Sequence, residues 1–176
     1  MLFRSELASI MSPISPFEEN LPKNQANYSP LTPLSFLTRT AEVFPERTAV
    51  IHGEIKRSWR ETLKRCTRLA SALKKKGVVQ GTTVSVMAPN VPELLEAHFG
   101  VLMNGGVLNA LNIRLEAETL AYILEHGESQ VLITDREFSP VIQKVLQQLK
   151  DPPLVIDIDD PMAEGGELLE IGRAHV

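Results

Sequence analysis

The sequence lacks several features that mark particular kinds of protein. Cys66 is the only cysteine, so no disulfide can form within the chain, which fits a reducing compartment. No run of about 18 apolar residues is present, so no membrane span is predicted. The first ten residues hold Arg4 and Glu6 among short apolar stretches and make a poor signal peptide. These features together predict a cytoplasmic protein.

Positive charge is also scarce. The formal net charge of the 176 residues is -4, and the only sizeable basic run is Lys74, Lys75 and Lys76. Nucleic-acid binding normally needs a concentrated basic face, so no nucleic-acid partner is predicted. Hydrophobic residues at 43% and charged residues at 23% are ordinary for a soluble globular protein. A chain of this length can bury one real core.

Regular structure is predicted to begin near Thr32. Residues 1–31 are rich in Pro, Ser and Asn without a sustained period, which predicts an irregular leader over 6–31. Thr32 as N-cap and Pro33 as first helical residue then favour a helix that Pro45 ends. Its predicted inner face is Leu34, Leu37, Ala41 and Phe44.

Two short β-prone runs on either side of His52, Gly53 and Glu54 predict a tight hairpin. Ser58 and Glu61 then form the pattern of a capping box that opens a second helix. Its residues at helical spacing are Trp59, Leu63, Cys66, Ala70 and Leu73, and Gly77 follows its end. The three lysines fall in its last turn, where the helix dipole favours cations.

The remaining sequence alternates between strands and helices. Strands are predicted from Thr83, Gly106, Gln130 and Pro153, and helices from Pro92, Ala117 and Ser139, with Ser139 as the cap of the last helix. Because these strands are short and apolar almost throughout, they should pair in parallel with helices on both faces. The fold class is therefore α/β, with a partial, mostly parallel, doubly wound sheet.

Such a sheet suggests a nucleotide site, but the matching motifs are absent. No Gly-x-Gly-x-x-Gly follows a strand. Gly100 to Gly105 has the spacing of a phosphate loop, yet Gly106 and Val107 stand where Lys and Ser or Thr are required. We interpret this stretch as the end of a helix. No Gly-x-Ser-x-Gly elbow is present to supply a hydrolase serine.

Metal-ligating and nucleophilic residues form no recognisable set either. The histidines lack the paired helical spacing of zinc sites and have no cysteine cluster beside them; they are His52, His98, His126 and His175. His98 could line a pocket beside Glu93 or Glu96, although a packed or half-exposed helix residue is the preferred interpretation. Asp157, Asp159 and Asp160 lack the central Gly and distal Glu of a calcium loop and are interpreted as a polar strand exit. Cys66 is interpreted as a small apolar helix residue, with a nucleophile as the alternative. No catalytic, cofactor-binding or metal-binding residue is assigned.

One long stretch carries a resemblance. Val84 to Leu115, "VSVMAPNVPELLEAHFGVLMNGGVLNALNIRL", resembles the early part of adenylate-forming acyl-CoA ligases, the AMP-binding family. The flanking segments match in order and spacing, so the resemblance covers about Asn27 to Leu169. "NYSPLTPLSFL", "HFGVLMNGG" and "LNIRL" look most similar to the branch acting on short, medium-chain or aromatic carboxylic acids. Leu102 and Asn104 depart from the pattern, where Pro and a small residue are usual.

The resemblance implies a two-step reaction. ATP and a carboxylate give an acyl-adenylate and pyrophosphate, with Mg assisting, and the thiol of coenzyme A then displaces AMP. The family's catalytic segments lie downstream: a Gly-rich loop ending Pro-Lys-Gly, an aromatic Thr-Glu segment, a ribose-binding Asp and a lysine of a C-terminal domain. None of these is in the sequence, so the fragment itself is expected to be inactive. The residues that match the early pattern are interpreted as cap, turn and packing residues: Asn90, Gly105, Gly106, Asn112 and Arg114.

Two alternatives stay open from the sequence. The chain could be a stand-alone, non-catalytic α/β binding or interaction domain; a dinucleotide-dependent enzyme is a weaker choice, because its fingerprint is absent. If the chain is a fragment, it should leave sheet edges and helix faces uncovered.

The two ends differ from the rest of the chain. Residues 1–5, "MLFRS", and residues 170–176, "EIGRAHV", match in-frame translations of a common pair of sequencing adapters. We therefore expect both segments to be artefacts of translation, with Met11 as a candidate start. A partial AMP-binding domain is expected over residues 32–169.

Overall fold

A computed structural model describes residues 32–160, 162–163, 165–167 and 169. The predictions for residues 1–5, 6–31 and 170–176, His175 included, concern residues outside this set. The chain divides into two units, Met1–Thr32 and Pro33–Val176, and every described residue except Thr32 belongs to the second.

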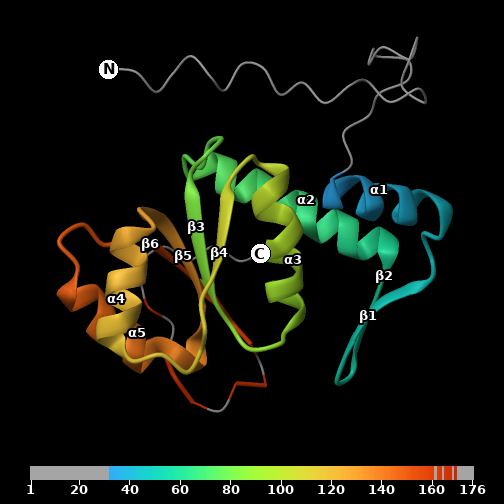
Figure 1. Ribbon diagram of the computed structural model, residues 1–176. Coiled ribbons are helices and arrows are strands. Elements are labelled where there is room, and N and C mark those ends of the chain that lie inside the picture. Colours follow the sequence, from blue (N-terminus) through green and yellow to red (C-terminus); the bar gives the residue numbers. More distant parts are fainter. Residues whose placement is uncertain (1–31, 161, 164, 168, 170–176) are drawn as a thin grey trace, which may run out of the picture. The chain divides into compact units, whose positions relative to one another are not determined.

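Four parallel strands form the central sheet (Figure 1). In chain order they are β3 (Thr83–Met87), β4 (Val107–Ala110), β5 (Ser129–Asp135) and β6 (Leu154–Ile158). They lie in the order β4-β3-β5-β6, so β3 and β5 are the central strands. The parallel pairing predicted from the apolar strands is confirmed: the register places Val84 beside Leu108 on one side and beside Val131 on the other.

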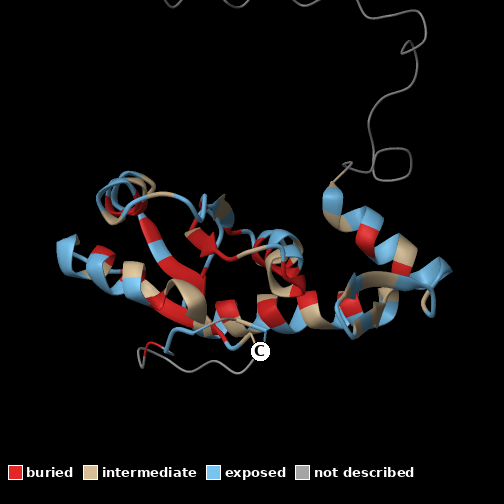
Figure 2. Ribbon diagram, turned by 90° about the horizontal axis from the view of Figure 1, so that it is seen from below, coloured by how far each residue is buried: buried red, intermediate tan, exposed pale blue. Residues whose placement is uncertain are grey.

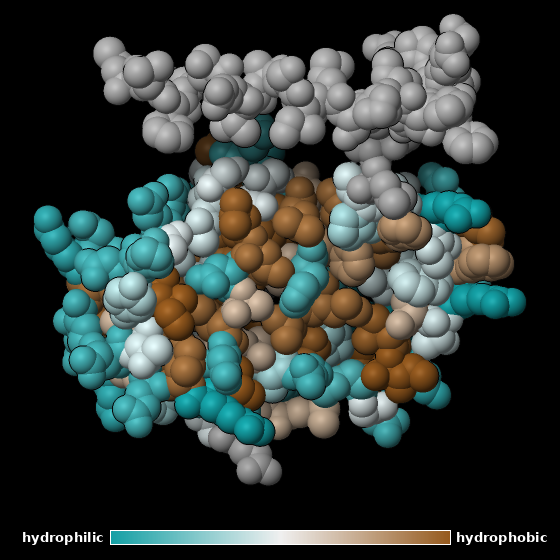
Figure 3. Space-filling view, viewed as in Figure 1, coloured by the Kyte–Doolittle hydropathy of each residue, from teal (hydrophilic) through white to brown (hydrophobic). Residues whose placement is uncertain are grey.

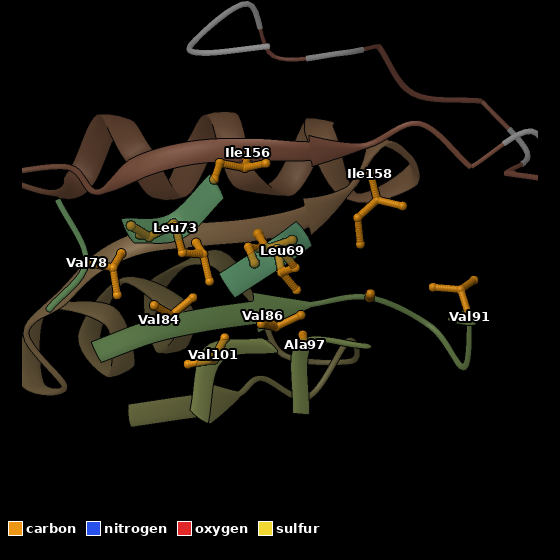
Figure 4. Packing of buried hydrophobic residues seen from close by; sticks show 13 residues of the cluster. Leu69, Leu73, Val78, Val84, Val86, Val91, Ala97, Val101, Ile156 and Ile158 are labelled. Carbon is orange, nitrogen blue, oxygen red and sulfur yellow. The ribbon is translucent and has the colours of Figure 1, made fainter. Parts of the chain in front are cut away.

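Helices cover both faces of this sheet. One face packs against α2 (Trp59–Lys75) and α3 (Pro92–Met103), the other against α4 (Ala117–His126) and α5 (Ser139–Gln148). In the first core, Figure 4 shows Leu69 and Leu73 of α2 and Ala97 and Val101 of α3 around Val84 and Val86. The second core contains Leu132, Val155, Leu120, Leu124, Ile142 and Val145. Buried residues accordingly concentrate where strands and helices face each other (Figure 2), and the predicted doubly wound α/β fold is confirmed.

A helix and a hairpin precede the sheet. α1 (Pro33–Val43) begins at Pro33 as predicted and buries Leu37 and Ala41. Phe44, predicted to lie on its inner face, is 46% exposed because the helix ends at Val43; its ring lies under the Arg47 guanidinium instead. The predicted hairpin is confirmed as antiparallel β1 (Thr48–His52) and β2 (Ile55–Ser58).

The predicted capping box of α2 is confirmed: the Ser58 hydroxyl accepts from the Glu61 N–H, and the Glu61 carboxylate accepts from the Ser58 N–H. The predicted inner face is partly wrong. Its buried residues are Thr62, Cys66, Leu69 and Leu73, whereas Leu63 and Ala70 are only half-buried. The stripe is turned because α2 packs closely against α3, where Leu69 meets Gly100.

The prediction for the start of α5 is also wrong in one detail. Ser139 lies inside the helix and does not cap it, because Phe138 is the N-cap residue. The Ser139 hydroxyl instead accepts a hydrogen bond of 3.0 Å from the Glu167 N–H. A short 3₁₀ turn, η1 (Arg136–Phe138), precedes α5 and is capped by the Asp135 carboxylate. No helix within the described ranges combines the length and hydrophobicity required to cross a bilayer.

Candidate functional site

The connections of the sheet locate the place where a doubly wound protein binds ligands. β3 leads into α3 on one face, and the neighbouring strand β5 leads through η1 into α5 on the other face. Ligands of such sheets bind beyond the carboxyl ends of the strands where the connections diverge. In this chain that point lies between the end of β3, at Met87, and the end of β5, at Asp135.

Carboxylates dominate this edge of the sheet. Asp135 is fully buried; one of its oxygens accepts the Glu137 N–H at 3.0 Å, and the other has no partner among the described residues. Burial raises the pKa of the Asp135 carboxyl. Burial also raises the pKa of Asp157, to about 6, although a hydrogen bond from the Leu169 backbone acts in the opposite direction.

The other predicted acidic residues lie just beyond. Asp159 pairs with Arg136 at 3.2 Å, and Asp160 accepts the Met162 N–H at 2.8 Å. These contacts are those of a polar strand exit. Phosphate groups need N–H donors and positive charge, so the carboxylates on this edge do not form a phosphate-binding site. Among the residues that the structure describes, no three His, Cys, Asp or Glu side chains form a group suited to a metal ion.

The structure brings two of the described histidines to one hollow and leaves His126 apart from them. His52 and His98 line a hollow of about 590 Å³ between β1 and α3, where the His98 Nδ1 lies 2.8 Å from the Leu94 carbonyl. Glu93 and Glu96 are not part of this lining, so His98 lines a pocket without the carboxylate neighbours considered from the sequence. His126 stacks on Tyr122 at 5.4 Å between ring centroids.

An ion cluster around the buried Glu96 was not predicted from the sequence. Arg57 of β2 and Arg65 of α2 both reach Glu96 of α3 at 2.5 Å and Glu93 at 3.1 Å. Glu96 is only 2% exposed, and the two arginines supply its ion-pair partners in that buried position. The cluster fixes the hairpin and α2 to α3, the helix that leaves the ligand-binding edge. The sequence offers no local signal for it, because the arginines lie 31 and 39 residues from Glu96.

The residues that match the family pattern have local roles. Gly105 adopts a φ of +77° just after α3, and the Asn112 side chain accepts the Arg114 N–H at 2.9 Å. The departure at Asn104 also has a role, because its amide donates to the Val78 carbonyl at 2.7 Å and ties the end of α3 to the loop after α2.

Two further residues of the pattern, Gly106 and Asn90, differ in their surroundings. A Cβ at Gly106 would lie 3.0 Å from Val101, which leaves no room for a side chain there without movement. Asn90 is exposed and lines the hollow beside α3.

Cys66 is fully buried, and burial raises the pKa of its thiol to about 12, so it is not a thiolate nucleophile at neutral pH.

Comparison with known proteins agrees with this architecture. The model of the AMP-binding enzyme family matches residues 37–175. Over 149 residues the chain is 47% identical to a peroxisomal acetate/butyrate–CoA ligase of Arabidopsis thaliana, covering 81% of this chain and 26% of the relative. Over 131 residues it is 46% identical to a peroxisomal trans-cinnamate:CoA ligase of Petunia hybrida, covering 74% of this chain and 23% of the relative.

The structural comparison gives the same result. A crystal structure of a protein assigned as a long-chain-fatty-acid CoA ligase, from Rhodopseudomonas palustris CGA009, superposes with a TM-score of 0.69 at 30% identity. The match covers 74% of this chain and 33% of that one. The chain spans about a quarter of the length of the curated relatives it matches. It therefore belongs to the AMP-binding enzyme family and corresponds to the amino-terminal part of its acyl-CoA ligases.

Proposed function

We propose that the chain is the amino-terminal part of an AMP-forming ligase that joins a small carboxylic acid to coenzyme A. The identity of 47% with an acetate/butyrate–CoA ligase over 149 residues carries this proposal. In the reaction, a carboxylate oxygen attacks the α-phosphorus of ATP and pyrophosphate leaves. The sulfur of coenzyme A then attacks the acyl carbon, AMP leaves, and the thiol proton is released.

The substrate class follows from the relatives. One is named for acetate and butyrate and the other for trans-cinnamate, so both act on small carboxylic acids. This range agrees with the short-chain, medium-chain or aromatic branch that the sequence resembles. We expect the complete protein to accept an acid of this class and to need ATP and Mg for the first step.

The 176-residue chain alone is expected to be inactive. No phosphate loop is present in the sequence, and Asp135 and Asp157 at the ligand-binding edge offer a phosphate group no positive charge. We expect the groups that hold ATP, Mg and coenzyme A to lie in the segments that the family resemblance places downstream. The described residues supply a four-stranded sheet with helices on both faces and the ion cluster that holds α3.

ATP–pyrophosphate exchange tests the proposal. The gene would be sequenced beyond this reading frame at its genomic source, and the whole protein would be produced from it. It would be assayed with acetate, butyrate, cinnamate and benzoate, with a reaction lacking acid as control. We expect exchange that depends on at least one acid. A soluble whole protein that fails with every acid overturns the proposal. The alternative of a stand-alone binding domain is not favoured, because the relatives are enzymes of which this chain covers 26% or less.

The cellular compartment of the whole protein is tested by a separate experiment. Both relatives are named peroxisomal, so the peroxisome competes with the cytoplasm predicted from the sequence. A fluorescent fusion to the amino terminus of the whole protein, imaged beside a peroxisome marker, distinguishes the two. Diffuse fluorescence supports the cytoplasmic prediction, and punctate fluorescence on the marker contradicts it.

A further inference from the structure

Positive and negative charges are separated along the chain. Residues 39–76, which include the end of α1, the hairpin and α2, hold eleven Lys or Arg and four Asp or Glu side chains. Residues 77–160, which form the sheet and the helices α3, α4 and α5, hold four basic and twelve acidic side chains. The formal net charge of -4 for the whole chain therefore conceals a strongly basic part.

Much of this positive charge lies on the outer side of α2. Lys64, Arg68 and Lys75 follow one another at spacings of four and seven residues, so they share one side of the helix. Lys74 and Lys76 flank the last of them, and all five side chains are exposed. None of the five forms a salt bridge with another described residue. We call these five residues the α2 basic face.

Two exposed apolar side chains adjoin the end of this basic face. Val79 follows Lys76 by three residues and is 64% exposed, and Val107, at the start of the edge strand β4, is 51% exposed. The turn that presents Val79 is closed by two bonds to Thr82: the Val79 N–H donates to the Thr82 Oγ1 at 3.0 Å, and the Thr82 N–H donates to the Val79 carbonyl at 3.1 Å. The Val107 N–H donates to the Thr82 carbonyl at 2.8 Å, which brings the two valines to the same end of the sheet.

This end lies opposite the ligand-binding edge. Val79 and Val107 precede or begin β3 and β4, whereas Met87 and Asp135 mark the carboxyl ends of β3 and β5. The acidic side chains at the amino end line a separate hollow before β5 and β6: Glu125, Glu128 and Asp151. Figure 3 shows hydrophobic residues over the part of the molecule where Figure 1 places β4, whereas hydrophilic residues gather over α4 and α5. The amino end is therefore basic and apolar on the side of β4 and β3, and acidic on the side of β5 and β6.

Basic side chains beside exposed apolar ones are the combination that binds an anionic membrane surface. The cations meet the anionic headgroups, and the apolar side chains enter the boundary with the acyl chains. We propose that the α2 basic face, together with Val79 and Val107, attaches the protein reversibly to an anionic lipid bilayer. The two valines line neither of the hollows described above, so they suit insertion between lipids better than the socket of a protein partner. The ligand-binding edge, at the opposite end of the sheet, would face away from the bilayer.

Vesicle cosedimentation of the whole protein tests the proposal. Vesicles of phosphatidylcholine and phosphatidylserine would be compared with vesicles of phosphatidylcholine alone. Lys75→Gln/Lys76→Gln removes two charges from the basic face, and Lys144→Gln/Lys150→Gln is the matched control at exposed positions on the side of α5. Gln has nearly the helix propensity of Lys, so circular dichroism should show the same fold for both variants. Val79→Ser removes one apolar side chain and leaves the charge unchanged.

We expect the protein to bind the anionic vesicles and to leave the neutral ones unbound. The partition coefficient of Lys75→Gln/Lys76→Gln should fall about 25-fold, because each basic residue near such a surface contributes about fivefold. The control pair should change it by less than about twofold, since charges beyond the screening length contribute little. Val79→Ser should lower it by about threefold, because binding scales with the apolar area that enters the lipid.

Four results would overturn the proposal. Two of them are the absence of binding to anionic vesicles and equal losses for the two pairs of lysines. The third is equal binding to neutral vesicles, which would show apolar adsorption alone. The fourth is release of the bound protein by polyglutamate at the charge concentration of the phosphatidylserine, which would assign the basic face to an acidic protein. The vesicles contain no substrate, so failure of the ligase assay leaves this result unaffected.

Discussion

Arg57 and Glu96 form an ion pair with 2.5 Å between Nη1 and Oε1, although they lie 39 residues apart in the sequence. Arg65 reaches the same carboxylate at 2.5 Å from its Nε, so Glu96 is shared by β2 and α2. The pair joins the hairpin to α3, the helix that leaves the ligand-binding edge. Its removal should therefore loosen both at once.

Glu96→Ala is expected to lower the free energy of unfolding of the chain by about 3–5 kcal/mol, because it leaves two part-buried arginines without their main partner. Urea denaturation followed by circular dichroism measures this change. Glu93→Ala is the matched control, since Glu93 is more exposed and should cost about 1 kcal/mol or less. Equal losses for the two variants would contradict the central role of Glu96.

Gly100→Ala should destabilise the contact between α2 and α3. A Cβ at Gly100 would lie 2.8 Å from the Leu69 Cδ2 and 3.0 Å from its Cβ, so the helices must move apart. Overpacking of this kind costs about 1–3 kcal/mol, more than the roughly 1 kcal/mol that alanine gains over glycine in a helix. In a double-mutant cycle with Leu69→Ala, the cost of Gly100→Ala should shrink, because the Leu69 Cγ and Cδ2 contacts are removed and only the Cβ contact of 3.0 Å remains. Strictly additive effects would show that the two residues do not compete for space.

The pH dependence of stability should change in Asp157→Asn. The pKa of Asp157 is raised from 3.8 to about 6 in the folded chain, so the folded state holds the proton more tightly than the unfolded state. The contribution of this group is therefore fully present below pH 3.8 and is lost as the pH rises through about 6.

The variant should accordingly gain stability relative to the original chain between pH 4 and pH 7. The gain should be on the order of 1–2 kcal/mol, since each pKa unit corresponds to about 1.4 kcal/mol and partial solvent access reduces the effect. Asp151→Asn, the same substitution at an exposed position, serves as the control. A difference that is constant across this pH range, or that shrinks as the pH rises, would contradict the assignment.

Cys66 should report unfolding of the chain. Because the thiol is buried and its pKa is raised to about 12, a thiol reagent at pH 8 should modify the native chain at least about a hundredfold more slowly than the urea-unfolded chain. Spectrophotometric thiol titration measures both rates. Rapid modification of the native chain would contradict the burial of the thiol and would make Cys66 a candidate nucleophile again.

Local patterns predicted the elements of the fold well. The capping box at Ser58 and Glu61, Pro33 at the start of α1 and the apolar run of β3 each depend on neighbouring residues only, and each is confirmed. Ser139 was mistaken for a cap because the carboxylate of Asp135, four residues earlier, starts a 3₁₀ turn that precedes α5. Ser139 itself bonds Glu167, a contact between residues that are distant in sequence.

The site was less accessible to sequence reasoning. Arg57 and Glu96 carry charges that look solvent-exposed until the hairpin is placed against α3, so their pairing depends on tertiary structure alone. The α2 basic face was visible in principle, since its charges recur on one side of a predicted helix. What the sequence did not show is that Val79 and Val107 lie together at its end, because that requires the pairing of β3 with β4.

Formation of acyl-CoA, measured by mass spectrometry in matched reactions of the whole protein and the 176-residue chain, tests the central claim most directly. Each reaction would contain ATP, Mg, coenzyme A and one small carboxylic acid. We predict an acyl-CoA product and an equal amount of AMP from the whole protein, and neither from the chain alone. Acyl-CoA formation by the 176-residue chain, or its absence from a folded whole protein with every small acid, would contradict the account.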